Sequence, residues 1–539
     1  MIAKDDHDHE GVVGEATEPL RTIDGLTLRS GVPQPYFAEE REGWKGYIEW
    51  ENYPEKAKQA QEILAKYDFP PPPEFQVGPL PDTNPILEGV RWKQYHAAMG
   101  PTLKDLPEKS WEYVKKEKSS DMIHVLQFPY NGEPPRKRLV ETEITPNKDF
   151  FVRNHGGIPE ISIEHYSLDI AGLVNEPKTL TLADLQNEAL FPRKSHVVSL
   201  QCSGTRRIEQ IKEYPGDGDE LINAPWGEGA IGTAKWTGVS LKKIIKYCGG
   251  LENGGEGMHV EFYGADTYFK KGQVYNYVVS VPWRKVQRNE VLLAWAMNGE
   301  PLPRIHGFPL RAVVFGYIGA RSAKWLYKIK VIKGPSLAPV QRKEYLYYSP
   351  QVGKQNATYS NGFSIQDMPV SSAIMEPVDQ DKIVHDGKIK LRGWAYSGGG
   401  HFPIRVEVSG DGGSIWYEVP FENMTTKYFH AWRLWEIDLP VDAEGWLEFC
   451  VRCWDDALNT QPTFVRSAWN WDLHVTSSCH RIKVYSINKT RPATAQRLKF
   501  LEEKGMSMLP LSRPLEIDLE TEEHWRDQME KRGPRDPLE

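Results

Sequence analysis

The stretch that most constrains the fold runs from Ser195 to Arg207 and has the sequence Ser-His-Val-Val-Ser-Leu-Gln-Cys-Ser-Gly-Thr-Arg-Arg. Its first half is apolar and β-branched, which is typical of a short buried strand. Cys202 stands where that strand ends, and Gly204 permits a sharp turn after it. The two arginines that follow favour the thiolate, the form that binds soft metals or acts as a nucleophile. By itself the pattern also fits a cysteine that is only a small core residue.

Segments elsewhere in the chain give this cysteine a context. Gln-Cys-Ser-Gly-Thr-Arg-Arg resembles the cysteine segment of the sulfite oxidase and assimilatory nitrate reductase family, in which the cysteine binds molybdenum held by a pterin dithiolene. Further segments similar to that family occur in the family's order: Phe150 to His155, and stretches that begin at Gly229, Met297, His306, Gly319 and Gln341. The resemblance implies a molybdopterin-dependent oxidoreductase, closest to a sulfite oxidase that lacks a haem domain.

Composition limits the classes of protein to which the chain belongs. Its 539 residues are too many for one core, so two or three domains are expected. An apolar fraction of 40% and 18 tryptophans favour well-buried cores. The net charge of −8 argues against a general nucleic-acid binder, and no apolar run is long enough to predict a membrane span.

Cysteine usage and the terminal sequences predict a cytoplasmic protein. Five cysteines in so long a chain give no disulfide framework, which favours a reducing compartment. The acidic, polar N-terminus fits neither a secretory signal nor a transit peptide, and the final Pro-Leu-Glu is not a peroxisomal tripeptide.

Shifts in pattern along the chain predict four regions. An irregular N-terminal arm covers 1–125, an α+β catalytic domain that binds the molybdenum cofactor covers 126–345, an all-β immunoglobulin-like sandwich covers 365–490, and a helical tail covers 491–539. The resemblance makes the sandwich a dimerisation domain and predicts a homodimer. Helices are expected at Pro54–Tyr67, Ser110–Lys118, from Leu182 with Thr181 as its cap, at Leu241–Cys248 with Ser240 as its cap, at Ala495–Lys504 and at Glu522–Lys531.

Short strands with turn signals between them predict the sandwich. The candidates are Val370–Ile374, Lys388–Trp394, Ile404–Ser409, Ser414–Val419 and Trp446–Trp454. Cys450 and Cys453 lie three apart on one of these strands and so point to opposite faces, which favours structural cysteines over a metal pair.

The resemblance assigns the cofactor residues. Cys202 is the molybdenum ligand, and a single protein ligand suffices because the dithiolene and oxygen atoms supply the others. The positions that match cofactor-binding residues are His155, His306, Arg311, Ser322 and Lys324. Arginine offers a planar fork to the pterin phosphate and lysine a point charge.

The resemblance also assigns the substrate residues. Arg153 and Arg207 match the arginines that face the substrate anion, and Trp226 matches a tryptophan of the same pocket. Tyr345 matches the tyrosine beside the metal-bound oxygen, where its phenol would donate a hydrogen bond.

One position departs from the family. Sulfite oxidases carry a third anion-binding arginine after a Trp-Asn pair, and the corresponding segment here, Trp469 to His474, aligns Asp472 with that arginine. The change weakens the case for sulfite without establishing nitrate, because assimilatory nitrate reductases also lack the arginine.

Three functions follow from these observations. The favoured one is oxidation of sulfite to sulfate, with dioxygen or a separate cytochrome as electron acceptor. The alternatives are the molybdenum module of a nitrate reductase and a non-catalytic dimer that binds molybdopterin. Another small oxygenated substrate also remains open.

Overall fold

The computed structural model describes most of the chain beyond residue 107. The described residues are 108–126, 129–213, 224–255, 257–270, 273–352, 356 and 359–505, together with 22–23, 26–27, 36, 39, 41 and 44–45. The helices expected at Pro54–Tyr67 and Glu522–Lys531 lie outside them. No helix within these residues is long and apolar enough to cross a membrane.

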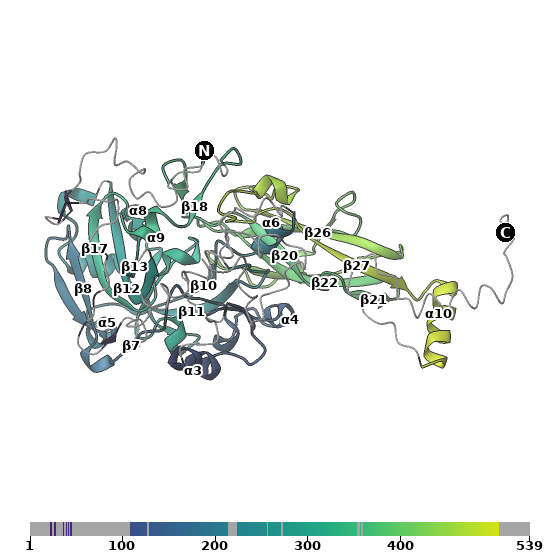
Figure 1. Ribbon diagram of the computed structural model, residues 1–539, viewed down its shortest axis with the longest axis horizontal. Coiled ribbons are helices and arrows are strands. Elements are labelled where there is room, and N and C mark those ends of the chain that lie inside the picture. Colours follow the sequence, from purple (N-terminus) through teal and green to yellow (C-terminus); the bar gives the residue numbers. More distant parts are fainter. Residues whose placement is uncertain are drawn as a thin grey trace, which may run out of the picture.

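A five-stranded sheet lies at one end of the molecule, with the strand order β13-β12-β17-β8-β9 (Figure 1). Its strands are β8 (Ser167–Gly172), β9 (Lys178–Thr181), β12 (Met258–Lys270), β13 (Gln273–Pro282) and β17 (Leu326–Lys333). From Lys328 to Val331 in β17 the exposure alternates: Lys328 and Lys330 are partly exposed, and Ile329 and Val331 are fully buried. This period of two places one face of the strand on the core.

A second five-stranded sheet carries the cysteine. Its strands are β10 (Lys194–Gln201), β11 (Ile231–Ser240), β14 (Val291–Met297), β15 (Glu300–Pro301) and β16 (Arg311–Val314). All its pairings are antiparallel, and the register pairs Gln201 with Ile231 at the end of β10. Cys202 therefore leaves the sheet directly after a paired strand, as the sequence predicted.

Short helices and small sheets complete the part of the described chain that precedes the sandwich. The helices are α3 (Glu108–Glu117), α4 (Arg136–Leu139), α5 (Leu182–Gln186), α6 (Arg207–Glu213), α7 (Leu241–Tyr247), α8 (Trp283–Gln287) and α9 (Pro339–Arg342). The small sheets are β1–β2 (Thr22–Ile23, Leu26–Thr27), β3–β7 (Trp44–Lys45, Glu160–Ile161), β4–β5–β6 (Ile123–Leu126, Asn131–Glu133, Val152–Arg153) and β18–β19 (Leu346–Tyr347, Phe363–Ser364).

The helix predictions are largely confirmed, with shifted ends. α5 begins after Thr181, whose hydroxyl accepts from the backbone of Asp184 in a capping box. The predicted helix at Ser110–Lys118 begins two residues earlier, at Glu108. Ser240 precedes α7 as expected but does not cap it, because its hydroxyl bonds Asn289 instead.

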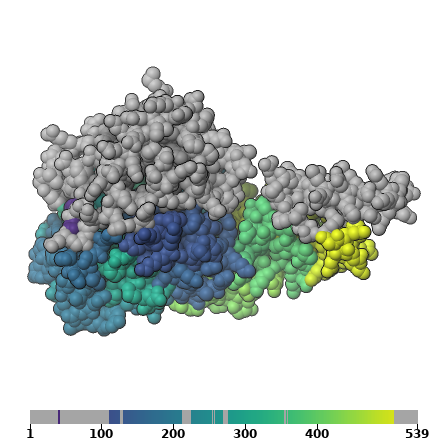
Figure 2. Space-filling view, turned by 60° about the horizontal axis from the view of Figure 1, so that its bottom comes forward, coloured from purple at the N-terminus to yellow at the C-terminus, as the bar shows by residue number. Residues whose placement is uncertain are grey.

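A β-sandwich forms the C-terminal part and extends to the helix α10 (Pro492–Glu503), shown in yellow at the far end of Figures 1 and 2. One sheet has the order β20-β22-β25 and the other β21-β27-β26-β23-β24. The strands are β20 (Ser371–Glu376), β21 (Lys382–His385), β22 (Lys388–Tyr396), β23 (Pro403–Ser409), β24 (Tyr417–Glu418), β25 (Arg433–Pro440), β26 (Gly445–Asp455) and β27 (His480–Asn488).

The interior of the sandwich is built from residues of both sheets. Leu391 and Leu439 of the three-stranded sheet join Val406 and Phe449 of the other in one cluster, and all four are fully buried. Cys450 and Cys453 are free and fully buried on β26, so both are core residues. The predicted fold class, an α+β domain followed by a sandwich, is confirmed.

Candidate active site

A cavity opens where the second sheet ends. It encloses about 640 Å³ of empty space, part of it open to solvent. Its walls come from segments far apart in the chain: Phe150 to Arg153, His155, Leu200, Cys202, Asp266, Tyr277, His306, Arg311, Gly319, Ala320, Ser322, Lys324 and Tyr345. One acidic and three cationic side chains among them make it a polar, positively charged site.

The cysteine loop forms one wall of this cavity. The backbone N–H of Cys202 donates to the Ala230 carbonyl at 2.9 Å, and the Gly204 N–H lies 3.4 Å from the sulfur. Glycine at 204 leaves room for Arg207, because a Cβ there would lie 2.6 Å from Nη2 of that guanidinium. The N–H groups of Thr205 and Arg207 close two turns by donating to the carbonyls of Cys202 and Gly204. Only 6% of Cys202 is exposed.

Buried cations line a second wall. The Arg311 guanidinium donates to the carbonyls of His306 at 3.0 Å and Ser322 at 3.2 Å, and it stacks 4.8 Å from the Trp236 ring. Burial lowers its pKa to about 9, so it stays charged at neutral pH. Lys324 donates to the Asn154 side chain and to the Ile305 carbonyl. Burial holds the pKa of Lys324 well below its usual range, which an anion bound there would reverse.

Asp266 faces these cations from the same cavity. Its Oδ1 atom is buried and has no hydrogen-bond partner among the described residues. Burial raises the pKa of this carboxyl, and the nearby Lys324 acts in the opposite direction. A buried acceptor without a partner is costly unless a ligand supplies a donor. Asp266 is therefore suited to a ligand that carries N–H groups.

A buried lysine near the end of the predicted N-terminal arm packs behind the cationic wall. Lys118 follows α3, and its Nζ donates to the carbonyls of Asn147 and Phe150, each at 2.6 Å, and lies 3.1 Å from Nε2 of His306. Burial lowers the pKa of Lys118 to about 7. Glu117 accepts from the backbone N–H groups of Arg304 and Ile305. The end of the predicted arm thus fixes the segment that carries His306.

Aromatic and imidazole rings form the end of the cavity near Arg153. The Tyr345 hydroxyl lies 2.5 Å from Nε2 of His155, and that imidazole packs 4.5 Å from the Tyr277 ring. Tyr345 has a left-handed backbone, with φ of 55°. Burial raises its pKa to about 12, against the nearby charge of Arg153, so the phenol keeps its proton. Tyr345 can therefore donate a hydrogen bond inside the cavity.

Two predicted residues stand one layer behind the walls. Arg207 is buried, and its guanidinium donates hydrogen bonds to the carbonyls of Leu473 at 2.9 Å and Ala224 at 2.7 Å. Trp226 is also fully buried and packs edge-on against Phe151, which lines the cavity. The structure thus brings His155, Cys202, His306, Arg311, Ser322, Lys324, Arg153 and Tyr345 to the cavity surface, and it places Arg207 and Trp226 behind it.

Sequence reasoning did not single out Asp266, Lys118 or the His474 imidazole described below. Asp266 lies within the long strand β12, where one sequence gives no sign that a carboxylate faces a cavity. The predicted helix ending at Lys118 was the only signal near that residue.

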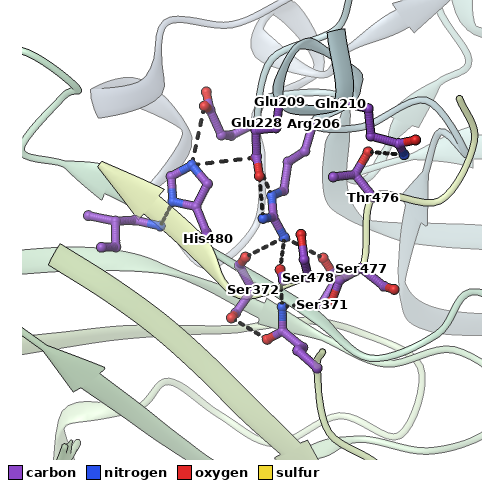
Figure 3. Close-up of polar contacts among 12 residues, drawn as sticks. Arg206, Glu209, Gln210, Glu228, Ser371, Ser372, Thr476, Ser477, Ser478 and His480 are labelled. Atoms are coloured by element: carbon purple, nitrogen blue, oxygen red, sulfur yellow. Dashed lines mark hydrogen bonds and ion pairs between the residues drawn. The ribbon is translucent and has the colours of Figure 1, made fainter. Parts of the chain in front are cut away.

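An ionic cluster joins the cysteine loop to the C-terminal sandwich (Figure 3). Arg206 is fully buried and forms a double ion pair with Glu209, and it also donates to the Ser372 and Ser478 carbonyls. Nε2 of His480, on β27, lies 3.3 Å from Glu228 and 3.7 Å from Glu209.

Although Glu209, Glu228 and His480 lie within 4.8 Å of one another, their bonds describe a salt-bridge network rather than a cation site. Arg206 and Arg136 already neutralise the two carboxylates. Nδ1 of His480 accepts from the Ile374 N–H at 3.0 Å, so Nε2 carries the proton of the neutral ring and is not free to ligate.

Comparisons with known proteins agree with this architecture. Residues 155–340 match the oxidoreductase molybdopterin-binding domain, and residues 362–487 match the molybdenum-cofactor oxidoreductase dimerisation domain. The second match supports a homodimer. Neither match tests the predicted domain boundaries, which stay predictions.

Proteins with similar sequences include sulfite oxidases. The chain is 39% identical to human mitochondrial sulfite oxidase over 365 residues, which are 67% of this chain but only 65% of that protein. It is 35% identical to the sulfite oxidase of Arabidopsis thaliana over 66% of this chain and 91% of the relative. It is 32% identical to nitrate reductase [NADH] 1 of Phaseolus vulgaris over 74% of this chain and 46% of that protein.

A solved structure shows the same fold. The sulfane dehydrogenase SoxCD of Paracoccus pantotrophus has a TM-score of 0.55 at 24% identity, covering 76% of this chain and 93% of that one. Taken together, the two domain matches, the relatives and the fold show that the chain belongs to the molybdopterin oxidoreductase family that includes sulfite oxidase and nitrate reductase, and that its cofactor is molybdenum bound to molybdopterin.

Proposed function

We propose that the protein oxidises sulfite to sulfate, with Cys202 as the one protein ligand of molybdenum. The observation that carries the proposal is the buried thiol at the surface of a cationic cavity, in a chain whose relatives include animal and plant sulfite oxidases. In the overall reaction, sulfite and water give sulfate, two electrons and two protons. The electrons pass to dioxygen or to a separate cytochrome, and a cytoplasmic location remains part of the proposal.

The residues of the cavity fit the cofactor. Arg311 and Lys324 are buried cations suited to a phosphate, and binding an anion would offset the burial that lowers the pKa of each. The unpartnered Oδ1 of Asp266 is an acceptor for the N–H groups of a pterin ring. Cys202 supplies the soft sulfur donor that molybdenum requires. His155, His306 and Ser322 complete the polar lining.

When bound, the cofactor supplies the oxygen atom that is transferred and takes up the two electrons. The chain's own task is to draw a small dianion toward Cys202 and to manage a proton beside it. Arg153 lies at the cavity surface with its charge close to Tyr345 and Cys202. Burial by itself lowers the pKa of Arg153, but the groups around it outweigh that effect and raise it, so the arginine is a permanent cation.

Tyr345 is the proposed proton-carrying group. With a pKa near 12 its phenol stays protonated at neutral pH, and its oxygen is hydrogen-bonded to His155 at 2.5 Å. The pair can hold a proton at the Tyr345 oxygen and pass it along to Nε2 of His155. Arg207 adds positive charge from behind the wall, and Trp226 backs Phe151, which excludes water and strengthens the attraction of the cations.

Nitrate reduction is the second candidate, favoured by the likeness to the bean nitrate reductase and by Asp472 in place of an arginine. The test is a steady-state assay of purified protein of known molybdenum content. Sulfite is offered with ferricyanide or dioxygen, and nitrate is offered with a reduced dye. We expect sulfate to form in proportion to molybdenum. Nitrate reduction without sulfite oxidation would reverse the order, and inactivity toward both in molybdenum-loaded protein would favour a non-catalytic dimer or another oxygenated substrate.

A further inference from the structure

The C-terminal sandwich sends one loop back onto the cysteine loop. The loop lies between the turn Val465–Ala468 and β27, and it contacts the catalytic part at Ser203, Arg207 and Gln210. The N–H of Val475 donates to the Ser203 carbonyl at 2.6 Å. Nε2 of Gln210 donates to Oγ1 of Thr476 at 2.8 Å (Figure 3). The two domains are therefore joined one residue away from Cys202.

The backbone of this loop is shaped to present His474. Leu473 and Val475, on either side of it, both have positive φ, at 51° and 55°. Bulky and β-branched residues rarely adopt this conformation, which costs about 1–2 kcal/mol for each residue. The Asn470 side chain bonds both the N–H and the carbonyl of His474 and so holds the turn. Strain of this kind persists where the surrounding structure needs a particular side-chain direction.

The His474 imidazole touches two residues that the proposed function uses. Its Nδ1 lies 3.1 Å from Nη2 of Arg207 and 3.1 Å from Oγ of Ser203. Its ring packs 5.5 Å from the Tyr345 ring. A guanidinium only donates, so Nδ1 must be the acceptor and the imidazole must be neutral. The burial of His474, together with the charges of Arg207, Arg153 and Arg321, holds its pKa well below the usual range, in agreement with that geometry.

The bond from Arg207 completes a fixed set of contacts around that guanidinium. Its Nε and Nη1 donate to the Leu473 and Ala224 carbonyls, and its Nη2 donates to His474. These carbonyls and the imidazole are neutral, so they orient the positive charge without cancelling it. The Arg207 charge remains close to Cys202, Arg153 and Tyr345, which line the cavity.

We propose that His474 is a positioning residue for oxyanion binding: its neutral imidazole fixes the guanidinium of Arg207 and the ring of Tyr345, so that the C-terminal domain sets the charge that the substrate meets. This role rests on the proposed function and adds a residue that controls how tightly the site binds a tetrahedral or pyramidal oxyanion. A residue acting in this way changes oxyanion affinity more than it changes the rate of turnover at saturation.

Two substitutions separate the two contacts. His474→Phe keeps a ring against Tyr345 but removes the acceptor for Arg207, and His474→Asn keeps an acceptor near the position of Nδ1 but removes the ring. His385→Asn is the matched control, because His385 is also a buried histidine of the sandwich, and its ring bonds Ser486 and the N–H of Gly387 within that domain. His474→Leu replaces the phenylalanine variant if that variant does not fold.

The readouts are the dissociation constant of sulfate, from calorimetry on the purified holoenzyme, and the KM and kcat for sulfite. We expect His474→Phe to weaken sulfate binding about tenfold and to raise the KM for sulfite about tenfold, because one hydrogen bond to a charged group is lost. The kcat should stay within about threefold of the wild-type value. His474→Asn should retain sulfate binding within about threefold, and His385→Asn should match the wild type.

Three other results would decide against the proposal. Equal sulfate affinity in the wild type and His474→Phe, or wild-type protein that binds no sulfate, would overturn it. An equal loss in the asparagine and phenylalanine variants would assign His474 a merely structural role. If the wild type binds sulfate with the expected order of variants but oxidises no sulfite, the sulfite proposal fails while the positioning role stands.

Discussion

At the scale of single residues, Cys202 is the side chain on which the proposed chemistry depends. Replacing it with serine buries a hydroxyl in place of a thiol, so the free energy of unfolding should fall by about 1–3 kcal/mol and the fold should remain. Activity should fall by more than about a hundredfold, because the proposed soft donor to molybdenum is lost. Sulfite turnover, molybdenum content and thermal unfolding check this, with Cys248→Ser, a buried cysteine outside the cavity, as the control. Full activity in Cys202→Ser would remove the ligand assignment.

Asp472 acts on the same site through charge. Burial lowers the pKa of Arg207, and the negative charge of Asp472 acts weakly in the opposite direction, so part of the positive charge at the guanidinium is compensated. Asp472→Asn removes that offset without burying a second guanidinium, as arginine would. We expect the KM for sulfite to fall about threefold, with kcat unchanged. Asp438→Asn, at an exposed position on β25, is the control. An unchanged KM would show that the Asp472 charge is screened from the substrate.

At the scale of elements, the turn after β10 depends on Gly204. A Cβ at this position would lie 2.6–2.7 Å from three atoms of the Arg207 guanidinium, which its own hydrogen bonds hold in place. Gly204→Ala should cost about 1–3 kcal/mol of stability and weaken oxyanion affinity, because either the turn or the guanidinium must move. Chemical denaturation and sulfate calorimetry measure both. Gly410→Ala, whose Cβ would lie 3.1 Å from the end of the Leu439 side chain, should cost less stability and leave sulfate affinity unchanged. Unchanged affinity in Gly204→Ala would show that Arg207 adapts freely.

At the scale of the whole molecule, the buried ionic cluster in Figure 3 joins the two domains. Burial opposes the ionisation of Glu228, but Arg136 and the bond from His480 outweigh it and hold the pKa of Glu228 well below 4.5. A carboxyl whose pKa is lower in the folded state stabilises it above the unfolded pKa, and this stabilisation is lost as pH falls through the folded pKa. The wild type should therefore lose stability progressively below pH 4.5.

Glu228→Gln tests this contribution. At pH 7 it should lower the free energy of unfolding by about 3–5 kcal/mol, because the largely buried charge of Arg136 is left beside a neutral amide. It should also flatten the acid limb of the plot of Tm against pH. Glu418→Gln, in an exposed pair with Arg405, should behave as the wild type. An unchanged acid limb in Glu228→Gln would assign that pH dependence to other carboxyl groups.

Local pattern in the sequence by itself determined much of the fold. The strand that ends before Cys202, the capped helix after Thr181 and the short strands of the sandwich all follow from periodicity and turn residues, which depend on neighbours along the chain. Resemblance to family segments indicated the cofactor and most of the residues that the cavity brings together. Helix ends were less predictable, since Ser240 bonds a distant asparagine rather than its own helix.

Only the tertiary structure decided which side chains meet. It placed Arg207 and Trp226 behind the cavity wall, and it brought Asp266, Lys118 and His474 to the site from three distant segments. His474 is 267 residues from Arg207 along the chain, and no local pattern encodes such a contact. The physical reason is that secondary structure follows from short-range sterics and hydrophobic period, whereas burial, pairing of charge and hydrogen bonding across domains depend on how the whole chain packs.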